Sequence, residues 1–232
     1  FFLRELKMHF LKAVILCGAE NASLGKFDPS TLGDQALFEL FISSFDDQRI
    51  FLGDDGFCQP IEGISRLDVD DNDAITSIDL FTNELGGTLC MQYLPPNLTR
   101  IDLYANGLSG EFNVKYLPPK LRFARVKQQN LEGNLDLTVL PEKIRFFDAS
   151  DNKMTGSLNF SCLPESLEAL LLSNNQFCGT INLLNVTQTL STGSVYASLN
   201  FMWNDRPVPS LEGKLVVDLK QNAFSGDILV RD

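Results

Sequence analysis

The chain has 232 residues, 44% hydrophobic and 21% charged, so it can bury a core and does not have a disordered composition. Its formal net charge of −11 would repel a phosphate backbone, which argues against nucleic acid as a partner. The sequence has no apolar run near the roughly 20 residues of a membrane-spanning helix, so we expect no membrane span in this chain.

The first segment with a pattern, residues 10–19, has two interpretations. It could be the end of a secretory signal peptide, because the small residues Cys17 and Ala19 follow a short apolar run. Apolar residues at helical spacing, and charges that interrupt the run, favour a retained amphipathic helix instead. The sequence leaves both interpretations open.

Residues 30–45 predict an amphipathic helix, with Ser30 or Asp34 available as its N-cap. The residues on its predicted face are Leu37, Leu40, Phe41, Ser44 and Phe45. The residues that follow form the sequence repeats described next. A stack of repeats exposes apolar core at each end, so we expect this helix to cover the first of them.

A Leu-Pro pair recurs every 23 residues, at Leu94, Leu117, Leu140 and Leu163. Around each pair the same frame, LxxLxLxxNxLxG, recurs. The LxL part predicts a short strand with alternate side chains inward, and stacking such strands builds one parallel sheet. The recurring Asn is predicted to lie inside the following turn and to bond backbone groups of neighbouring coils. Gln129 replaces it once, which predicts a local distortion.

This pattern resembles the leucine-rich-repeat family, and the Leu-Pro and Ser-Gly or Thr-Gly steps are similar to its 23-residue plant and protist repeats, LPxxLxxLxLxxNxLSG. The resemblance implies a mostly β, right-handed solenoid with N-terminal helices, a parallel concave sheet and a second short strand per coil. We expect a helical cap at residues 1–63 and about seven to eight coils at 64–232.

The repeat loosens near residues 186–213. Asn175 and Asn222 are 47 residues apart, two periods and one residue, so we expect a degenerate coil between them, around residues 192–202. The sequence shows no C-terminal cap, and further protein or a partner is expected to cover that edge.

Phe57 and Cys58, followed by Gly63 and Ile64, resemble the N-terminal cap of secreted repeat proteins, but the second cap cysteine of those proteins is missing. The five cysteines form no CxxC pair, which argues against a disulfide framework and a zinc site and favours packed or free thiols. We expect no metal and no cofactor.

The compartment is suggested by four Asn-x-Ser/Thr sequons, some of which chance alone would produce. The sequons begin at Asn21, Asn97, Asn159 and Asn185. They make the chain a candidate glycoprotein and favour a secretory or cell-surface location over an intracellular one.

The positions between the inward residues of each strand are predicted to face the concave surface, where packing leaves residue identity free. The candidate binding face consists of Asp79, Phe81, Arg100, Asp102, Tyr104, Phe123, Arg125, Lys127, Phe146 and Asp148. Exposed aromatic and arginine side chains are typical of interface hot spots. The alternative is that the aspartates only keep the sheet soluble and pair with neighbouring arginines.

Catalytic chemistry is not expected, because the single histidine, His9, has no serine or cysteine partner at a suitable spacing. The acidic run at residues 68–73 lacks the Gly and Glu that complete an EF-hand calcium loop. We therefore expect a module that recognises another protein with its concave face. The alternative is a structural or scaffold subunit bound through the solenoid ends or the convex face.

Overall fold

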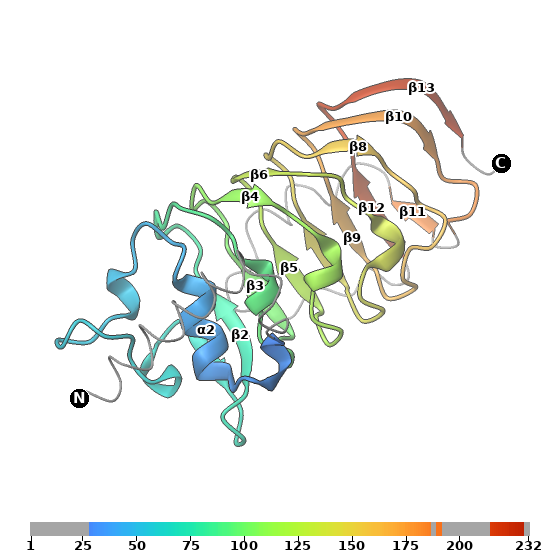
Figure 1. The fold of residues 1–232 in the computed structure, drawn as a ribbon. Helices are drawn as coiled ribbons and strands as arrows, with labels where there is room; N and C mark the ends of the chain where they lie inside the picture. Colours follow the sequence, from blue (N-terminus) through green and yellow to red (C-terminus); the bar gives the residue numbers. More distant parts are fainter. Residues whose placement is uncertain (1–27, 187–188, 192–213, 230–232) are drawn as a thin grey trace, which may run out of the picture. The chain divides into compact units, whose positions relative to one another are not determined.

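The computed structural model describes residues 28–186, 189–191 and 214–229 (Figure 1). The chain forms two compact units, Phe1–Gly33 and Asp34–Asp232. The described part of the first unit holds the 3-10 helix η1 (Pro29–Thr31). The segment at residues 10–19, Asn21 and the predicted degenerate coil at residues 192–202 lie outside the described residues. The domain boundary after residue 63 stays a prediction.

The second unit is built around an eight-stranded sheet with the order β1-β2-β3-β5-β7-β9-β12-β11. Its strands are β1 (Leu67–Val69), β2 (Ile75–Asp79), β3 (Arg100–Asp102), β5 (Phe123–Arg125), β7 (Phe146–Asp148), β9 (Ala169–Leu171), β12 (Lys214–Asp218) and β11 (Thr189–Ser191). Only the β1–β2 pair is antiparallel among these strands. In the pairs β2–β3, β3–β5, β5–β7 and β7–β9, each residue lies beside the residue 23 positions later, as Ile78 lies beside Ile101. The predicted repeat register is therefore confirmed over these coils.

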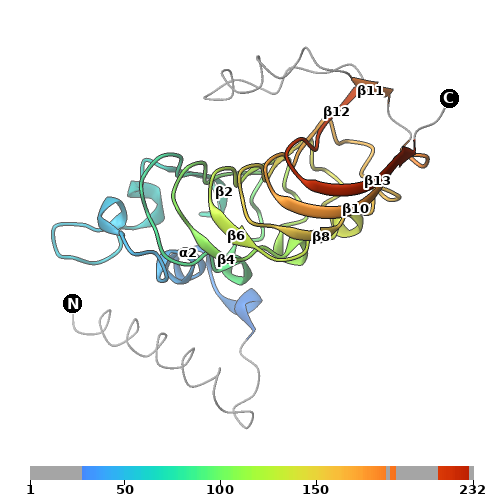
Figure 2. The same cartoon turned by 90° about the horizontal axis from the view of Figure 1, so that it is seen from above.

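A second set of parallel strands lies on another side of the same coils (Figure 2). These strands are β4 (Ser109–Glu111), β6 (Asn130–Glu132), β8 (Thr155–Ser157), β10 (Gln176–Asn182) and β13 (Ala223–Leu229). Three 3-10 helices, η4 (Met91–Tyr93), η5 (Val114–Tyr116) and η6 (Leu137–Val139), follow one another along the coils (Figure 1). The predicted second strand is confirmed, but in β4, β8 and β13 it contains the Ser-Gly or Thr-Gly step, and in β6 it ends before Gly133. The alternating residues after Gly110, such as Val114 and Tyr116, form a 3-10 turn instead.

The core is formed by the inward residues of the LxL strands. Among them are Ile78, Leu80, Ile101, Leu103, Ala124, Val126, Phe147, Ala149, Leu170 and Leu172, none more than 2% exposed. Phe147 lies beside the small Ala124 on the neighbouring strand, and its ring centroid is 5.9 Å from that of Phe112. A large side chain next to a small one keeps the packing close where the repeat departs from leucine.

The asparagine ladder is present as predicted. Asn152 Nδ2 donates to the carbonyl oxygens of Val126 (2.9 Å) and Ala149 (3.1 Å), and its Oδ1 accepts from the Leu131 N–H (3.0 Å). One amide side chain thus satisfies buried backbone groups of two successive coils, which would otherwise be costly to leave unpaired.

Gln129 continues this ladder in spite of its extra methylene. Its Oε1 accepts from the Leu108 N–H at 2.8 Å, and its Nε2 donates to the Leu103 carbonyl. The larger sheet passes this coil in unbroken register. The distortion predicted for Gln129 is therefore absent from the concave sheet.

The C-terminal coils depart from the 23-residue spacing. β12 pairs directly with β9, with Val217 beside Leu170, and β11 lies outside β12 although it comes earlier in the chain. Asn222 Nδ2 donates to the Leu172 carbonyl at 3.0 Å, as a ladder residue does toward the preceding coil. No strand therefore lies between those of the Asn175 and Asn222 coils in this sheet, and the degenerate coil predicted at residues 192–202 falls outside the described residues. A spacing of two periods fits one coil with an insertion as well as two coils.

The start of the second unit is helical. It contains α2 (Asp34–Ile42), η2 (Arg49–Phe51) and η3 (Ile61–Gly63). Helix α2 lies at the β2 end of the large sheet (Figure 1), and Phe38 and Phe41 are fully buried there. The Asp34 carboxylate, expected as an N-cap, accepts from the backbone N–H of Ile75 (2.7 Å) and so ties the helix to β2. Burial raises the pKa of Asp34.

The segment after α2 also pairs with the first coil through backbone hydrogen bonds. The Thr88 N–H donates to the Ser44 carbonyl, and the Asp47 N–H donates to the Leu85 carbonyl, both at 2.9 Å. Gly87 has a φ of 82°, and a Cβ there would collide with the Ser44 carbonyl oxygen. Glycine therefore permits both this backbone conformation and the close approach of the two segments.

Cys90, Cys162 and Cys178 carry free thiols.

No helix in the described ranges combines the length and the apolar character needed to cross a bilayer.

Candidate functional site

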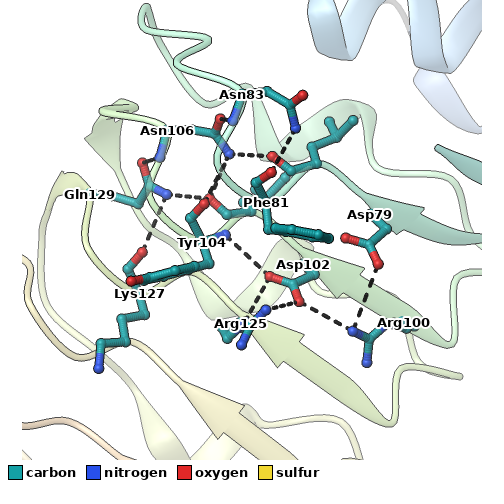
Figure 3. Close-up of polar contacts among 12 residues, drawn as sticks. Asp79, Phe81, Asn83, Arg100, Asp102, Tyr104, Asn106, Arg125, Lys127 and Gln129 are labelled. Carbon is teal, nitrogen blue, oxygen red and sulfur yellow. Dashed lines mark hydrogen bonds and ion pairs between the residues drawn. The ribbon is translucent and has the colours of Figure 1, made fainter. Parts of the chain in front are cut away.

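The ten candidate residues come from strands β2, β3, β5 and β7 and from the turns that follow the first three. Figure 3 shows those from β2, β3 and the following turns, with Arg125 and Lys127, around the Asp102 carboxylate. Strand pairing places Asp79, Asp102, Arg125 and Asp148 side by side in one column across the sheet. The concave face is defined here as the outward side of this sheet and its adjoining turns.

Asp102 is the electrostatic centre of the concave face. Its side chain is fully buried, and Arg125 donates to both of its carboxylate oxygens, from Nε at 2.8 Å and Nη2 at 2.5 Å. Arg100 Nη2 lies 3.2 Å from Asp102 Oδ2 and 4.0 Å from Asp79 Oδ2. A bidentate guanidinium offsets much of the cost of burying a carboxylate, and it fixes the geometry of both groups.

The aromatic rings lie against these arginines. The Arg100 guanidinium is 3.9 Å from the centroid of Phe123, whose ring stacks on Phe146 at 4.7 Å with an interplanar angle of 8°. The Arg125 guanidinium is 5.1 Å from the Tyr104 ring. Arginine and rings therefore form one ordered layer on the sheet, in which each cation faces an aromatic surface.

The sequence prediction that all ten side chains are exposed is wrong for half of them. Asp102, Phe123, Arg125, Phe146 and Asp148 are no more than 9% exposed. Side chains in one column of a parallel sheet are separated by about 4.8 Å, so large neighbours cover one another. These five residues support the concave face from below and do not present large contact areas to a partner.

Two aspartates on this face have raised pKa values. Burial raises the pKa of Asp148, whose Oδ1 accepts from the N–H of Ser150 (3.0 Å) and from its hydroxyl (2.5 Å). Burial, followed by the nearby Asp102 charge, raises the pKa of Asp79. Asp79 Oδ1 is buried and accepts no hydrogen bond within the described part of the chain.

Phe81, Tyr104 and Lys127 are partly exposed, and they follow strands β2, β3 and β5 in that order. Their turns are joined by backbone hydrogen bonds, from the Thr82 N–H to the Tyr104 carbonyl (2.7 Å) and from the Ala105 N–H to the Lys127 carbonyl (3.1 Å). These bonds hold the three side chains in one column on successive coils. We call Phe81, Tyr104 and Lys127 the exposed row.

The structure adds two residues to the predicted set. The Arg66 guanidinium lies 5.6 Å from the Phe81 ring, and Asp151 Oδ2 lies 3.5 Å from Lys127 Nζ. Each occupies a repeat position that faces the same surface, so the column pattern could have identified both. Among the residues the structure describes, no cluster of three or more His, Cys, Asp or Glu side chains could hold a metal ion.

Three of the sequon asparagines, Asn97, Asn159 and Asn185, lie within the described residues. Asn159 and Asn185 are exposed, and Asn97 is half-buried with its Oδ1 accepting from Lys120 Nζ at 2.7 Å. Asn159 Oδ1 accepts from the N–H of Ser161, the third residue of its sequon, at 3.0 Å. Exposure makes Asn159 and Asn185 sterically available for modification.

Comparison with solved structures confirms the leucine-rich-repeat fold. The chain aligns with PEPR1 in the PEPR1-AtPEP1 crystal structure with a TM-score of 0.56 and 18% identity, over 84% of this chain and 26% of that one. It aligns with the leucine-rich-repeat ectodomain of the receptor kinase SOBIR1 from Arabidopsis thaliana with a TM-score of 0.52 and 17% identity, over 82% and 95% of the two chains. The chain therefore spans about a quarter of the first structure's length. No family model and no curated protein matches it.

Proposed function

We propose that this leucine-rich-repeat solenoid is a protein-recognition module that binds another protein through its concave face. The observation that carries the proposal is the exposed row, in which two aromatic rings and a lysine stand half-exposed on successive coils. Aromatic and arginine residues dominate the energetics of protein interfaces, which makes this row a candidate anchor for a partner.

The layer beneath the row supports the same proposal. Arg66 lies over Phe81 and Arg125 over Tyr104, and the Arg125 guanidinium is itself held by the buried Asp102 carboxylate. Rings held in place before binding lose little conformational entropy when a partner arrives. Successive strands are about 4.8 Å apart, so the three side chains of the row span about 10 Å and could contact one partner together.

Two of the ten residues predicted for the binding face are unsuitable as probes of this proposal. Arg125 and Phe146 are buried, so replacing either with alanine would disturb folding as well as binding. Phe81, Tyr104 and Lys127 are the better probes of the surface itself.

The test is a binding comparison after the partner has been captured with the native chain and identified. We expect Phe81→Ala and Tyr104→Ala each to weaken the complex by about 2 kcal/mol, and Lys127→Ala by less. Lys153→Ala, exposed in a turn leading to the second strand set, is the control and should bind like the wild type. If the row variants bind as tightly as the wild type, the concave face is not the interface.

We further propose a secretory or cell-surface location, supported by the exposure of Asn159 and Asn185. Intact-mass measurement of the native protein should show glycan that peptide N-glycosidase removes. Native protein with the unmodified mass at both sites would contradict this location.

A second candidate is a structural subunit bound through an end of the solenoid. Its support is β13, an edge strand of its sheet, on which Ile228 is 62% and Leu229 40% exposed. Apolar side chains on an edge strand are suited to contact with another protein. If Ile228→Ser abolishes binding while the row variants do not, this candidate replaces the concave one.

A further inference from the structure

A groove of about 290 Å³ lies on the solenoid between the coils that contain η5 and η6. Val114, Leu117, Val139 and Leu140 contribute apolar surface to it, together with Pro119 and Pro141. None of the lining residues belongs to the strands or turns that form the concave face. The groove is therefore a second surface feature, separate from the exposed row.

The walls of the groove are fixed by hydrogen bonds inside each coil. Asn113 Oδ1 accepts from the Lys115 N–H (3.1 Å) at the start of η5, and Asp136 Oδ1 accepts from the Thr138 N–H (3.0 Å) at the start of η6. Both interactions are side-chain caps of the short helical turns. The groove is thus preformed, so a ligand would not have to order it.

Apolar side chains remain uncovered at this place. Val139, which lines the groove, is 42% exposed. Leu117 and Leu140, by contrast, are 8% and 7% exposed and form its deeper part. An apolar floor with an exposed apolar rim would gain free energy by burying one aliphatic or aromatic side chain.

The charges around the groove indicate what should flank that side chain. Lys115 and Lys143 both line the groove, and neither forms an ion pair within the described residues. The nearby Asp136 carboxylate is already bonded to the N–H and the hydroxyl of Thr138. Glu142 is the one acidic residue in the lining, against two lysines, in a chain whose net charge is −11.

We propose that this groove binds a short segment of a partner protein that carries an apolar side chain next to acidic residues. The apolar side chain would occupy the space between Leu117 and Leu140, and carboxylates would lie beside Lys115 and Lys143. The overall negative charge of the chain disfavours non-specific binding of acidic peptides, so such binding has to come from a local site.

The test uses a fluorescein-labelled peptide, Glu-Asp-Leu-Leu-Asp-Glu, and measures its fluorescence anisotropy on titration with the full chain. We expect saturable binding that Glu-Asp-Ser-Ser-Asp-Glu and Lys-Lys-Leu-Leu-Lys-Lys do not reproduce. The variant Lys115→Gln/Lys143→Gln should raise Kd about tenfold, and Val139→Asp should raise it at least as much. These three side chains are exposed at least in part, so the variants should fold.

Lys153→Gln removes a lysine of the same charge elsewhere on the surface and should change Kd by less than about twofold. Several outcomes would overturn the proposal. The first is no saturable binding of the acidic peptide up to about 1 mM, which is the weak limit for a peptide site. The second is a Kd raised as much by Lys153→Gln as by the groove variants. The third is tighter binding of Lys-Lys-Leu-Leu-Lys-Lys than of Glu-Asp-Leu-Leu-Asp-Glu. Self-association of the chain that Val139→Asp abolishes would assign the groove to a second copy instead. The test uses no variant of the concave face, so a negative result would not contradict the proposed function.

Discussion

The central coils of the solenoid, from β3 to β7, and its C-terminal coils, β9 and β12, use the same repeat positions in different ways. In the column of outward strand residues, the central coils place the buried Asp102, Arg125 and Asp148, whereas β12 has the half-buried Asp218. The strand neighbours β7 and β9 are also 23 residues apart, whereas β9 and β12 are separated by 47. The repeat frame therefore fixes the backbone, but the neighbouring coils decide what each position does.

The largest expected effect is at Asp102, which holds Arg125 and Arg100. Asp102→Ala would leave the Arg125 guanidinium buried without its bidentate partner, and we expect it to lower the free energy of unfolding by about 3–5 kcal/mol. Asp218→Ala, at the equivalent position of β12, should cost less than about 1 kcal/mol. Urea unfolding of both variants measures the difference, and equal losses would remove the distinction between the two regions.

The next effect concerns the ladder. Asn152→Leu would leave the Val126 and Ala149 carbonyls and the Leu131 N–H without their side-chain partner, at a cost of about 1–3 kcal/mol. Asn222→Leu should cost less, because that side chain is half-buried and water can replace some of its bonds. Thermal unfolding compares the two. No loss on Asn152→Leu would contradict the repeat register itself.

A smaller effect is expected from Asp148, and it depends on pH. Burial raises the folded-state pKa of Asp148 above the ordinary value of 3.8, so the folded chain binds a proton more tightly than the unfolded chain does. This group therefore lowers stability as the pH rises from 3.8 through the raised folded-state pKa. Asp148→Asn keeps an oxygen for Ser150 and removes the charge, so we expect it to be more stable than the wild type at pH 7.

The gain from Asp148→Asn should shrink as the pH falls from the raised folded-state pKa to 3.8, because below 3.8 the wild-type carboxyl is protonated in both states. Unfolding by urea at pH 7 and pH 3 measures this change. A difference between variant and wild type that stays constant over this range would show that the Asp148 charge does not limit stability.

The sequence was enough to predict the repeat, the strand register and the ladder, because residue type, order and period agreed over successive coils. It also placed Phe81, Tyr104 and Lys127 on the candidate binding face. It could not predict that Phe123 and Phe146 are buried, because their coverage depends on side chains stacking across adjacent strands. The packing of a column is a property of several coils at once, and no single repeat encodes it.

Two other features also lay beyond the sequence pattern. One is the direct pairing of β12 with β9. The repeat period alone does not distinguish this pairing from a further coil between the two strands. The residue before each ladder amide, from Thr82 to Gln221, has a left-handed φ between 54° and 58°, which non-glycine residues rarely adopt. The ladder hydrogen bonds hold this strained turn, so its sequence can vary and gives little signal.

The most direct test of concave recognition is site-specific photo-crosslinking in the native protein's own environment. A benzophenone side chain would replace Tyr104, the half-exposed ring beside the Arg125 guanidinium, and a second variant would carry it in place of Lys153. We expect a covalent adduct with one protein partner from position 104 and none from position 153. An adduct from position 153 with none from position 104 would contradict recognition through the concave face.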